Sequence, residues 1–198
     1  MNYNKYTLED ICSIITDYVA NGSFKSLAQN VEYKTKKDCA RLIRLYDRGN
    51  KYDEKDAIWI PESSYEFLKK SKLYGGEIII ANVGANLGTT FLCPKLPYAM
   101  SLGPNSIMLK TNEKCDQNYL YYYLISKDGQ SRLASIVSGS AMPKFNKTDL
   151  RKIELELPSI ETQKKVSKLL ADIDAKIECN NRTNDNLHHI LYCPAFIR

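Results

Sequence analysis

The sequence predicts an α/β protein of the α+β kind, in which a globular domain with a mixed or antiparallel sheet precedes one long C-terminal helix. Up to residue 157, short β-branched stretches alternate with short helical patterns and turn residues. Pro158 then interrupts the chain, and neither glycine nor proline follows until Pro194. With 198 residues, of which 43% are hydrophobic, the chain is long enough to bury a core. We therefore expect a domain at 1–157 and a helical segment at 158–198.

Four elements are expected in the first 72 residues. Residues 7–19 carry apolar side chains at helical spacing after Thr7, a residue type that caps helices, and predict a helix. Residues 20–30 contain a turn-forming Asn-Gly pair and predict an irregular stretch. Residues 40–46 alternate in character and predict a short strand. Residues 62–72 predict a helix whose C-terminal lysines suit its dipole.

The clearest strand signals lie in the middle of the chain. Residues 77–83 and 89–93 are β-branched and flank the sequence GANLG, which predicts a hairpin or a bulged turn, and residues 105–110 predict a further strand. GANLG resembles a phosphate-binding loop only superficially, because it lacks the lysine and hydroxyl of that loop and a strand follows it. We therefore expect no nucleotide site there.

Two helices, a loop and a strand are expected before Pro158. Residues 116–126 predict a helix with an acidic N-terminal cap, and its tyrosines are expected to pack in the core rather than to stack on bases. Residues 131–137 predict a second helix. The sequence SGSAMPKFNKTDL that follows is expected to be a loop, and residues 152–157 are expected to form a short strand.

The segment after Pro158 predicts one helix over residues 159–192 with a heptad repeat, whose core positions step alternately by four and three residues. One core position holds Val166, Ile173, Asn180 and Leu187, and the other holds Leu170, Ile177, Asn184 and Leu191. Buried asparagines must meet other polar groups, so they would select the register and the partner. These eight core positions form one narrow apolar row along the helix, the heptad seam. So narrow a seam favours pairing with another helix, although a helix packed on its own domain has a similar pattern. We expect the seam to mediate dimerisation.

The composition argues against several functional classes. The six cysteines are scattered without a CxxC pair, which argues against a zinc site or a disulfide framework, and the two histidines are adjacent near the end of the sequence. No Ser/His/Asp, Cys/His or paired-carboxylate constellation emerges, so we expect neither catalysis nor a metal nor a cofactor. No apolar run is long enough for a membrane span, and the polar start is unlike a signal peptide. A soluble, cytoplasmic protein is expected.

The net charge of +5 comes from two segments. Residues 21–72 carry 12 lysines and arginines against 8 acidic residues, and residues 127–152 carry 6 against 2. Within these segments lie two polar loops, at 21–30 and at 138–147. Their lysines suit phosphates, and their amides and hydroxyls suit base edges. Solvated lysine-rich surfaces with both loop phenylalanines turned inward have the same composition, and the residues alone do not decide between the two.

The order of these features resembles the specificity subunits of type I restriction-modification enzymes. The hairpin sequence GGEIIIANVGANLGTTFLCP is followed by LGPNSIML, by SGSAMPKFNKTDLRKIELELP and by the helix SIETQKKVSKLLADIDAKIECNNRTNDNL. The match is specific over residues 75–187 and looser before them. The helix pattern of the family is matched at Glu161, Gln163, Lys164, Val166, Leu169, Leu170, Ile173, Asp174, Lys176, Ile177, Glu178 and Asn180.

The resemblance implies a target recognition domain followed by a spacer helix, in a subunit that catalyses nothing itself. Methyl transfer and cleavage would belong to partner modification and restriction subunits, which bring S-adenosylmethionine and ATP. A full subunit of the family usually carries two recognition domains and two such helices, whereas this chain has one of each. We therefore expect the helix to pair antiparallel with a second copy, and the homodimer to read a palindromic, bipartite site in double-stranded DNA. The alternative is a truncated protein, inactive on DNA, that binds modification subunits or exchanges domains with other specificity subunits.

With this resemblance in view, four segments are expected to face one DNA half-site: residues 21–30, 41–48, 82–88 and 138–147. Phosphate or guanine contacts are expected from Lys25, Arg44, Lys144 and Lys147. Base-edge contacts are expected from Asn21, Ser23, Asn82, Asn86, Ser140 and Asn146. These assignments rest on residue chemistry and on the expected placement of the loops.

Overall fold

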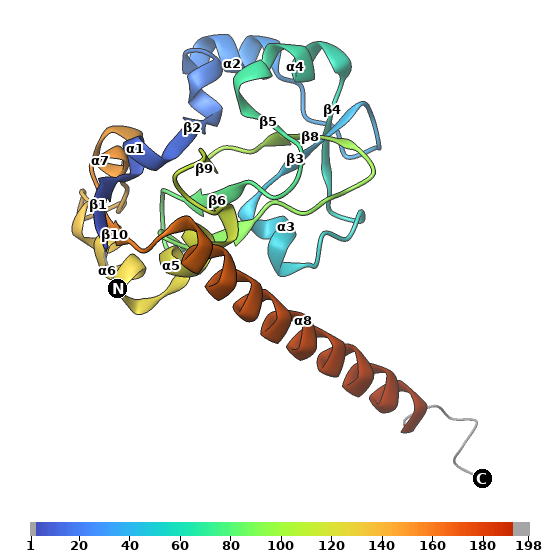
Figure 1. Cartoon of the computed structure of the whole chain (residues 1–198). Coiled ribbons are helices and arrows are strands. Elements are labelled where there is room, and N and C mark those ends of the chain that lie inside the picture. Colours follow the sequence, from blue (N-terminus) through green and yellow to red (C-terminus); the bar gives the residue numbers. More distant parts are fainter. Residues whose placement is uncertain (1–2, 192–198) are drawn as a thin grey trace.

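This computed structural model describes residues 3–191, without the side chains of residues 185, 186 and 188–191. The strands of the described residues form three sheets (Figure 1). An antiparallel sheet has the order β2-β9-β6-β7, with β2 at Cys12–Asp17, β9 at Ser106–Thr111, β6 at Ile78–Ala81 and β7 at Thr90–Leu92. A mixed sheet has the order β4-β3-β8-β5, with β4 at Ile58–Ile60, β3 at Ala40–Ile43, β8 at Ala99–Leu102 and β5 at Lys72–Leu73. Strands β3 and β8 run parallel. The third sheet pairs β1 (Asn4–Thr7) with β10 (Glu154–Leu157).

Strand β6 shows why the two larger sheets pack together. Ile78 and Ile80 join one core with side chains of β9, α5 (Gln117–Ile125) and α6 (Lys127–Ser135). Ile79 joins a second core with side chains of the mixed sheet. Because successive side chains of a strand point to opposite faces, the isoleucine run is buried on both.

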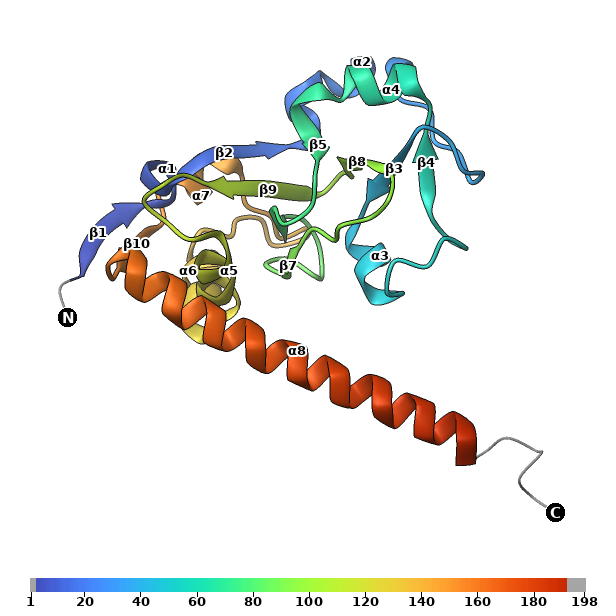
Figure 2. The ribbon, with the colours of Figure 1, turned by 45° about the vertical axis from the view of Figure 1, so that its right-hand side comes forward.

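The other face of the mixed sheet is covered by helices α2 (Phe24–Asn30) and α4 (Glu62–Phe67), which lie together above it in Figure 2. Leu27 of α2 and Leu68, the residue after α4, pack there with Leu42 and Ile60. Leu42 and its neighbour Ile43 therefore serve different cores, again because strand side chains alternate.

Most of the expected elements are confirmed, with shifted ends. Strands β6 and β7 form the expected antiparallel hairpin, and strands β3, β9 and β10 lie where they were expected. Asp116 caps α5 as expected, because its side chain accepts a hydrogen bond from the Tyr119 amide. The helix expected at 62–72 is divided into α4 and a 3-10 turn at Lys69–Ser71. Helix α6 lies earlier than the expected 131–137.

The expectation of one helix over residues 7–19 is wrong. Only α1 (Leu8–Ile11) is helical, and it begins at a capping box between Thr7 and Asp10. The chain then becomes strand β2, which pairs antiparallel with β9. The reason is tertiary: β9 pairs with β6 on one side, and its other side provides backbone hydrogen-bond partners for residues 12–17. This pairing outweighs a helical pattern of β-branched residues.

The irregular stretch expected at 20–30 is also wrong, because most of it is helix α2. Ser23 caps this helix by accepting a hydrogen bond from the Ser26 amide at 3.2 Å. Similarly, the expected loop after α6 contains a short helix, α7 (Lys147–Arg151), which Asn146 caps. In both places the capping residue, Ser23 or Asn146, is one that the sequence analysis predicted to contact DNA.

The long helix is confirmed as α8 (Ile160–Leu191), and the last residue of the expected range lies outside the described residues. It passes along α5 and then extends away from the sheets (Figures 1 and 2). Gln163 and Ser167 near its start are buried, and all side chains from 172 to 184 are exposed. Within residues 3–191, no helix combines the length and the apolar character that a membrane crossing needs.

Candidate nucleic-acid interface

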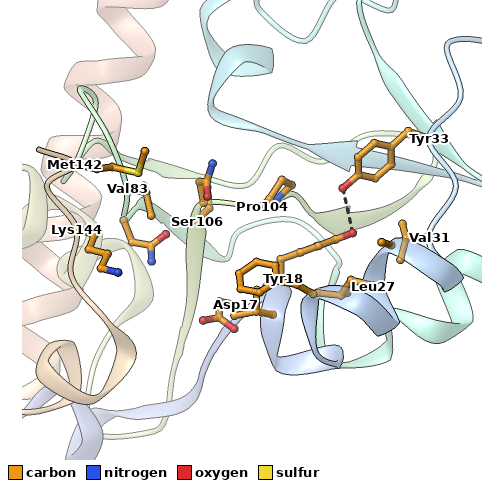
Figure 3. Close-up of a pocket in the computed structure, with 15 residues that line it drawn as sticks. Asp17, Tyr18, Leu27, Val31, Tyr33, Val83, Pro104, Ser106, Met142 and Lys144 are labelled. Atoms are coloured by element: carbon orange, nitrogen blue, oxygen red, sulfur yellow. Dashed lines mark hydrogen bonds between the residues drawn. The ribbon is translucent and has the colours of Figure 1, made fainter.

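A groove of about 560 Å³ lies between helix α2 and the loop that precedes α7 (Figure 3). One wall comes from the start of the chain and includes Tyr18 and Phe24. The opposite wall comes from the loop and includes Met142 and Lys144. Between them, Val83 follows β6 and other residues precede β9. The groove therefore joins the two polar segments that the sequence singled out, although they lie more than a hundred residues apart.

The loop wall is held by backbone hydrogen bonds. Ser138 and Lys144 bond to each other in both directions, at 2.8 and 2.9 Å, which closes the loop into a narrow turn. The Gly84 amide donates to the Pro143 carbonyl at 3.0 Å, and the Phe145 amide donates to the Asn82 carbonyl at 3.2 Å. Phe145 itself is buried in the core. The loop is thus anchored on the turn after β6, and Lys144 is presented at the groove.

The helical wall is held by its cap and by one buried side chain. Ser23 caps α2, and Leu27 is buried in the core. This orientation leaves Phe24, the first residue of α2, 83% exposed at the groove. Met142 on the opposite wall is 63% exposed. The two loop phenylalanines therefore differ: Phe24 faces solvent, and Phe145 is turned inward.

Two tyrosines extend this wall (Figure 3). The Tyr33 hydroxyl donates to the Tyr18 hydroxyl at 3.0 Å. Burial, together with this hydrogen bond, raises the pKa of the Tyr18 hydroxyl. The pair places two hydroxyl groups beside the apolar surface of the groove.

The charge left open at the groove is positive. Asp17 is the one acidic residue in the described lining, and its carboxylate accepts a hydrogen bond from Lys147 Nζ at 2.8 Å and another from the Ala20 amide. Lys144 lines the groove, and Lys25 follows Phe24 directly; both are exposed and make no ion pair among the described residues. Lys144 is therefore an unpaired cation in the described lining, and Lys25 is an exposed cation next in sequence to the lining residue Phe24.

Several residues expected to contact DNA already have structural partners. Asn21 donates to the Tyr18 carbonyl and the Ser71 hydroxyl, and its carbonyl oxygen accepts from the Lys70 amide. Ser23 and Asn146 are helix caps, and Lys147 is paired with Asp17. Their polar groups hold the two walls of the groove in place.

Arg44 lies away from the groove, as does the whole expected segment 41–48. Arg44 and the buried Arg41 both bond to the carboxylate of Asp47, with nitrogen–oxygen distances of 3.0 and 3.2 Å. Asn86 lies in a separate hollow beside α3 (Leu45–Gly49). Of the expected contacts, Asn82 and Lys144 line the groove, and Lys25 and Ser140 are exposed in the segments that form its walls.

The sequence assignment missed Tyr18, Tyr33, Met142 and the turn at Pro104 and Asn105, which all line the groove. A signal for the turn was present, because a Pro-Asn pair before a strand marks a tight turn, and Asn105 has a φ of 61°. The tyrosine pair gave no local signal, since its hydrogen bond joins two segments that meet only in the fold.

The predicted heptad seam of α8 is open to solvent along most of its described length. Val166, Ile173, Ile177 and Leu187 are each between 39% and 52% exposed, Asn180 and Asn184 are exposed, and Leu170 is half-buried. The side chain of Leu191 lies outside the described residues. An apolar stripe with this exposure is available to a partner.

Comparison with known proteins adds to this geometry. The family model described as "Type I restriction modification DNA specificity domain" matches residues 1–189. The type I restriction enzyme MjaVIII specificity subunit of Methanocaldococcus jannaschii is 30% identical over 157 residues, covering 69% of this chain and 35% of the relative. The MjaIX specificity subunit of the same organism is 27% identical over 162 residues, covering 81% of this chain and 35% of the relative.

The fold has solved counterparts. The crystal structure of the S subunit of a type I restriction-modification system from M. genitalium aligns with a TM-score of 0.56 at 17% identity, covering 100% of this chain and 48% of that chain. The chain thus spans about a third of the length of the curated relatives and just under half of the solved subunit. With a family model that matches nearly its whole length, this chain belongs to the type I restriction-modification DNA specificity domain family.

Proposed function

We propose that this chain is the DNA-recognition part of a type I restriction-modification system, that it binds one half-site of a bipartite target, and that it directs partner methyltransferase and restriction subunits to it. Family membership supports this proposal. The observation that carries it is the convergence of two distant, positively charged segments on one groove whose single described carboxylate is neutralised.

The groove offers the three kinds of contact that duplex recognition uses. Lys25 and Lys144 are available to phosphates. The amide group of Asn105 is exposed in the lining and can meet base edges, whereas the amide nitrogen of Asn82 already donates to the Phe145 carbonyl at 3.2 Å and its amide oxygen is buried. Phe24 and Met142 present apolar surface that fits the methyl group of thymine. Recognition would need no reacting group from this chain, and the chemistry on DNA would belong to the partner subunits.

Fluorescence anisotropy on random and selected duplexes at several salt concentrations tests this function. We expect the affinity to fall steeply with salt, and Lys144→Ala to weaken binding to all sequences while reducing the salt slope by about one. Lys95→Ala is the matched control, because Lys95 is exposed but does not line the groove. Absence of salt-dependent binding, even with a modification subunit present, would refute the proposal.

We also propose that two copies pair antiparallel through the seam of α8, so that the dimer reads a palindromic site. Analytical ultracentrifugation tests this pairing. The double variant Ile173→Asp with Ile177→Asp should be monomeric at concentrations where the wild type is dimeric, because a charge in a helical seam loses its hydration. Ala175→Asp is the control, since Ala175 is exposed and lies two residues from both Ile173 and Ile177, on the opposite side of the helix. A wild type that is monomeric at micromolar concentration would end this part of the proposal.

The exposed seam also favours a second candidate, a protein that binds modification subunits without binding DNA. Pull-down of a modification subunit distinguishes the two functions. Capture that survives Lys144→Ala, together with no DNA binding by either form, would establish the second candidate in place of the first.

A further inference from the structure

The start of α8 is joined to the domain by a buried glutamine. Gln163 is 1% exposed. Its side-chain oxygen accepts from the Asp116 amide at 3.0 Å, and its nitrogen donates to the Pro158 carbonyl at 2.9 Å. Asp116 is also the residue that caps α5. The first turns of α5 and α8 are therefore held together by one side chain whose polar groups are satisfied.

A second contact joins the two helices further along. The Tyr122 hydroxyl of α5 donates to the Asp174 carboxylate of α8 at 2.8 Å. Asp174 lies about 16 Å from Gln163 along the helix axis, at the rise of 1.5 Å per residue of an α-helix. Between them, Ser167 is buried and Leu170 is half-buried on the same side of α8. The contact with α5 is thus a stripe with a polar tie at each end.

Beyond Asp174, the described side chains of α8 have no such support, and those from 172 to 184 are all exposed. A helix held at one point can pivot about it, whereas a helix held at two points has a set direction. In Figure 2, α8 is straight: the part that extends away from the domain continues in the direction of the part that packs along α5. The two ties therefore control where the far end of the helix lies.

We propose that Tyr122 is a positioning residue which, together with Gln163, sets the angle at which α8 leaves the globular domain, and so determines which half-site spacings a pair of chains accepts. The first part depends only on the geometry of one chain. The second part rests on the proposed function.

The chain provides its own labelling sites for a test of the angle. Cys39 in the domain and Cys179 on α8 are exposed, whereas Cys93 and Cys115 are buried. The other accessible cysteines are changed to serine, and spin labels are attached to Cys39 and Cys179. Pulsed electron paramagnetic resonance then measures the distance between the two labels, and so between the domain and the helix. Dilution with unlabelled chain removes distances between copies.

We expect a narrow distance distribution in the wild type and a roughly twofold wider one in Tyr122→Phe, which loses only the hydroxyl that ties α8. Tyr123→Phe is the matched control, because the Tyr123 hydroxyl bonds to Asp128 and not to α8. Asp174→Asn keeps an acceptor and should retain the narrow distribution, whereas Asp174→Leu should not. Equal widths in the wild type and Tyr122→Phe would overturn the proposal.

A second measurement tests the consequence for DNA. The wild type should bind more weakly to duplexes whose half-sites are one base pair further apart or closer together than its preferred spacing. The loss of affinity should be smaller for Tyr122→Phe. If the distribution broadens while the spacing preference is unchanged, the role in spacing is wrong. If no form of the protein binds DNA, the proposed function fails, and the distance measurement still decides the role of Tyr122 in holding the helix.

Discussion

Replacing Asp47 by alanine should strongly destabilise the domain. The carboxylate is fully buried and accepts hydrogen bonds from Arg41, from the Arg44 guanidinium and, at 2.9 Å, from the Arg44 amide. Arg41 is fully buried too, and it also donates to the carbonyls of Tyr52 and Asp53. Without Asp47, the Arg41 charge keeps its neutral partners but loses the negative charge that offsets its burial.

Leaving one member of a buried ion pair uncompensated costs about 3–5 kcal/mol. A domain of this kind has a total stability of about 5–15 kcal/mol, so the loss is a large fraction of it. In urea denaturation, with a slope of about 2 kcal/mol per molar, the midpoint should fall by about 1.5–2.5 M. Circular dichroism and tyrosine fluorescence should report the same shift.

A surface pair provides the control for this experiment. Glu178 and Arg182 form an exposed ion pair on α8, and Glu178→Ala should leave the midpoint unchanged within error. The double variant Arg41→Met with Asp47→Leu should recover much of the stability, because neither charge remains buried. A fall of less than about 1 kcal/mol in Asp47→Ala would refute the view that Arg41 depends on this carboxylate.

Three further predictions concern stability. Phe145→Ala should cost about 3–5 kcal/mol by calorimetry, whereas Phe24→Ala should change stability by less than about 0.5 kcal/mol, and equal losses would contradict their different burial. Ser23→Ala should cost about 1 kcal/mol in urea through the lost cap of α2, and no change would show that the cap is dispensable. Burial raises the pKa of the Cys12 and Cys115 thiols to about 12, while the unfolded chain releases these protons near an ordinary value of about 9. The free energy of unfolding should therefore be highest below about pH 9 and fall as the pH rises towards 12. A urea midpoint that does not fall between pH 8 and 10.5, measured under reducing conditions, would contradict this prediction.

Local signals were enough for several elements of this fold. The absence of glycine and proline after Pro158 predicts α8, because a helix forms from bonds between near neighbours. The isoleucine run of β6 and the GANLG turn predict the hairpin with β7 for the same reason. Residues 12–17 misled the prediction, because their strand exists only through pairing with β9 in the folded chain.

The sequence by itself thus determined the class of the fold, the long helix and the two positively charged segments that meet at the groove. Only the tertiary structure decided which of their polar groups are available. Lys147 is paired with Asp17, 130 residues earlier in the chain, and Arg44 with a carboxylate shared by the buried Arg41, whereas Lys144 remains open at the groove. Composition shows which charges a segment carries, but the distance between two charges, which decides whether they neutralise each other, is set by packing between segments far apart in the chain.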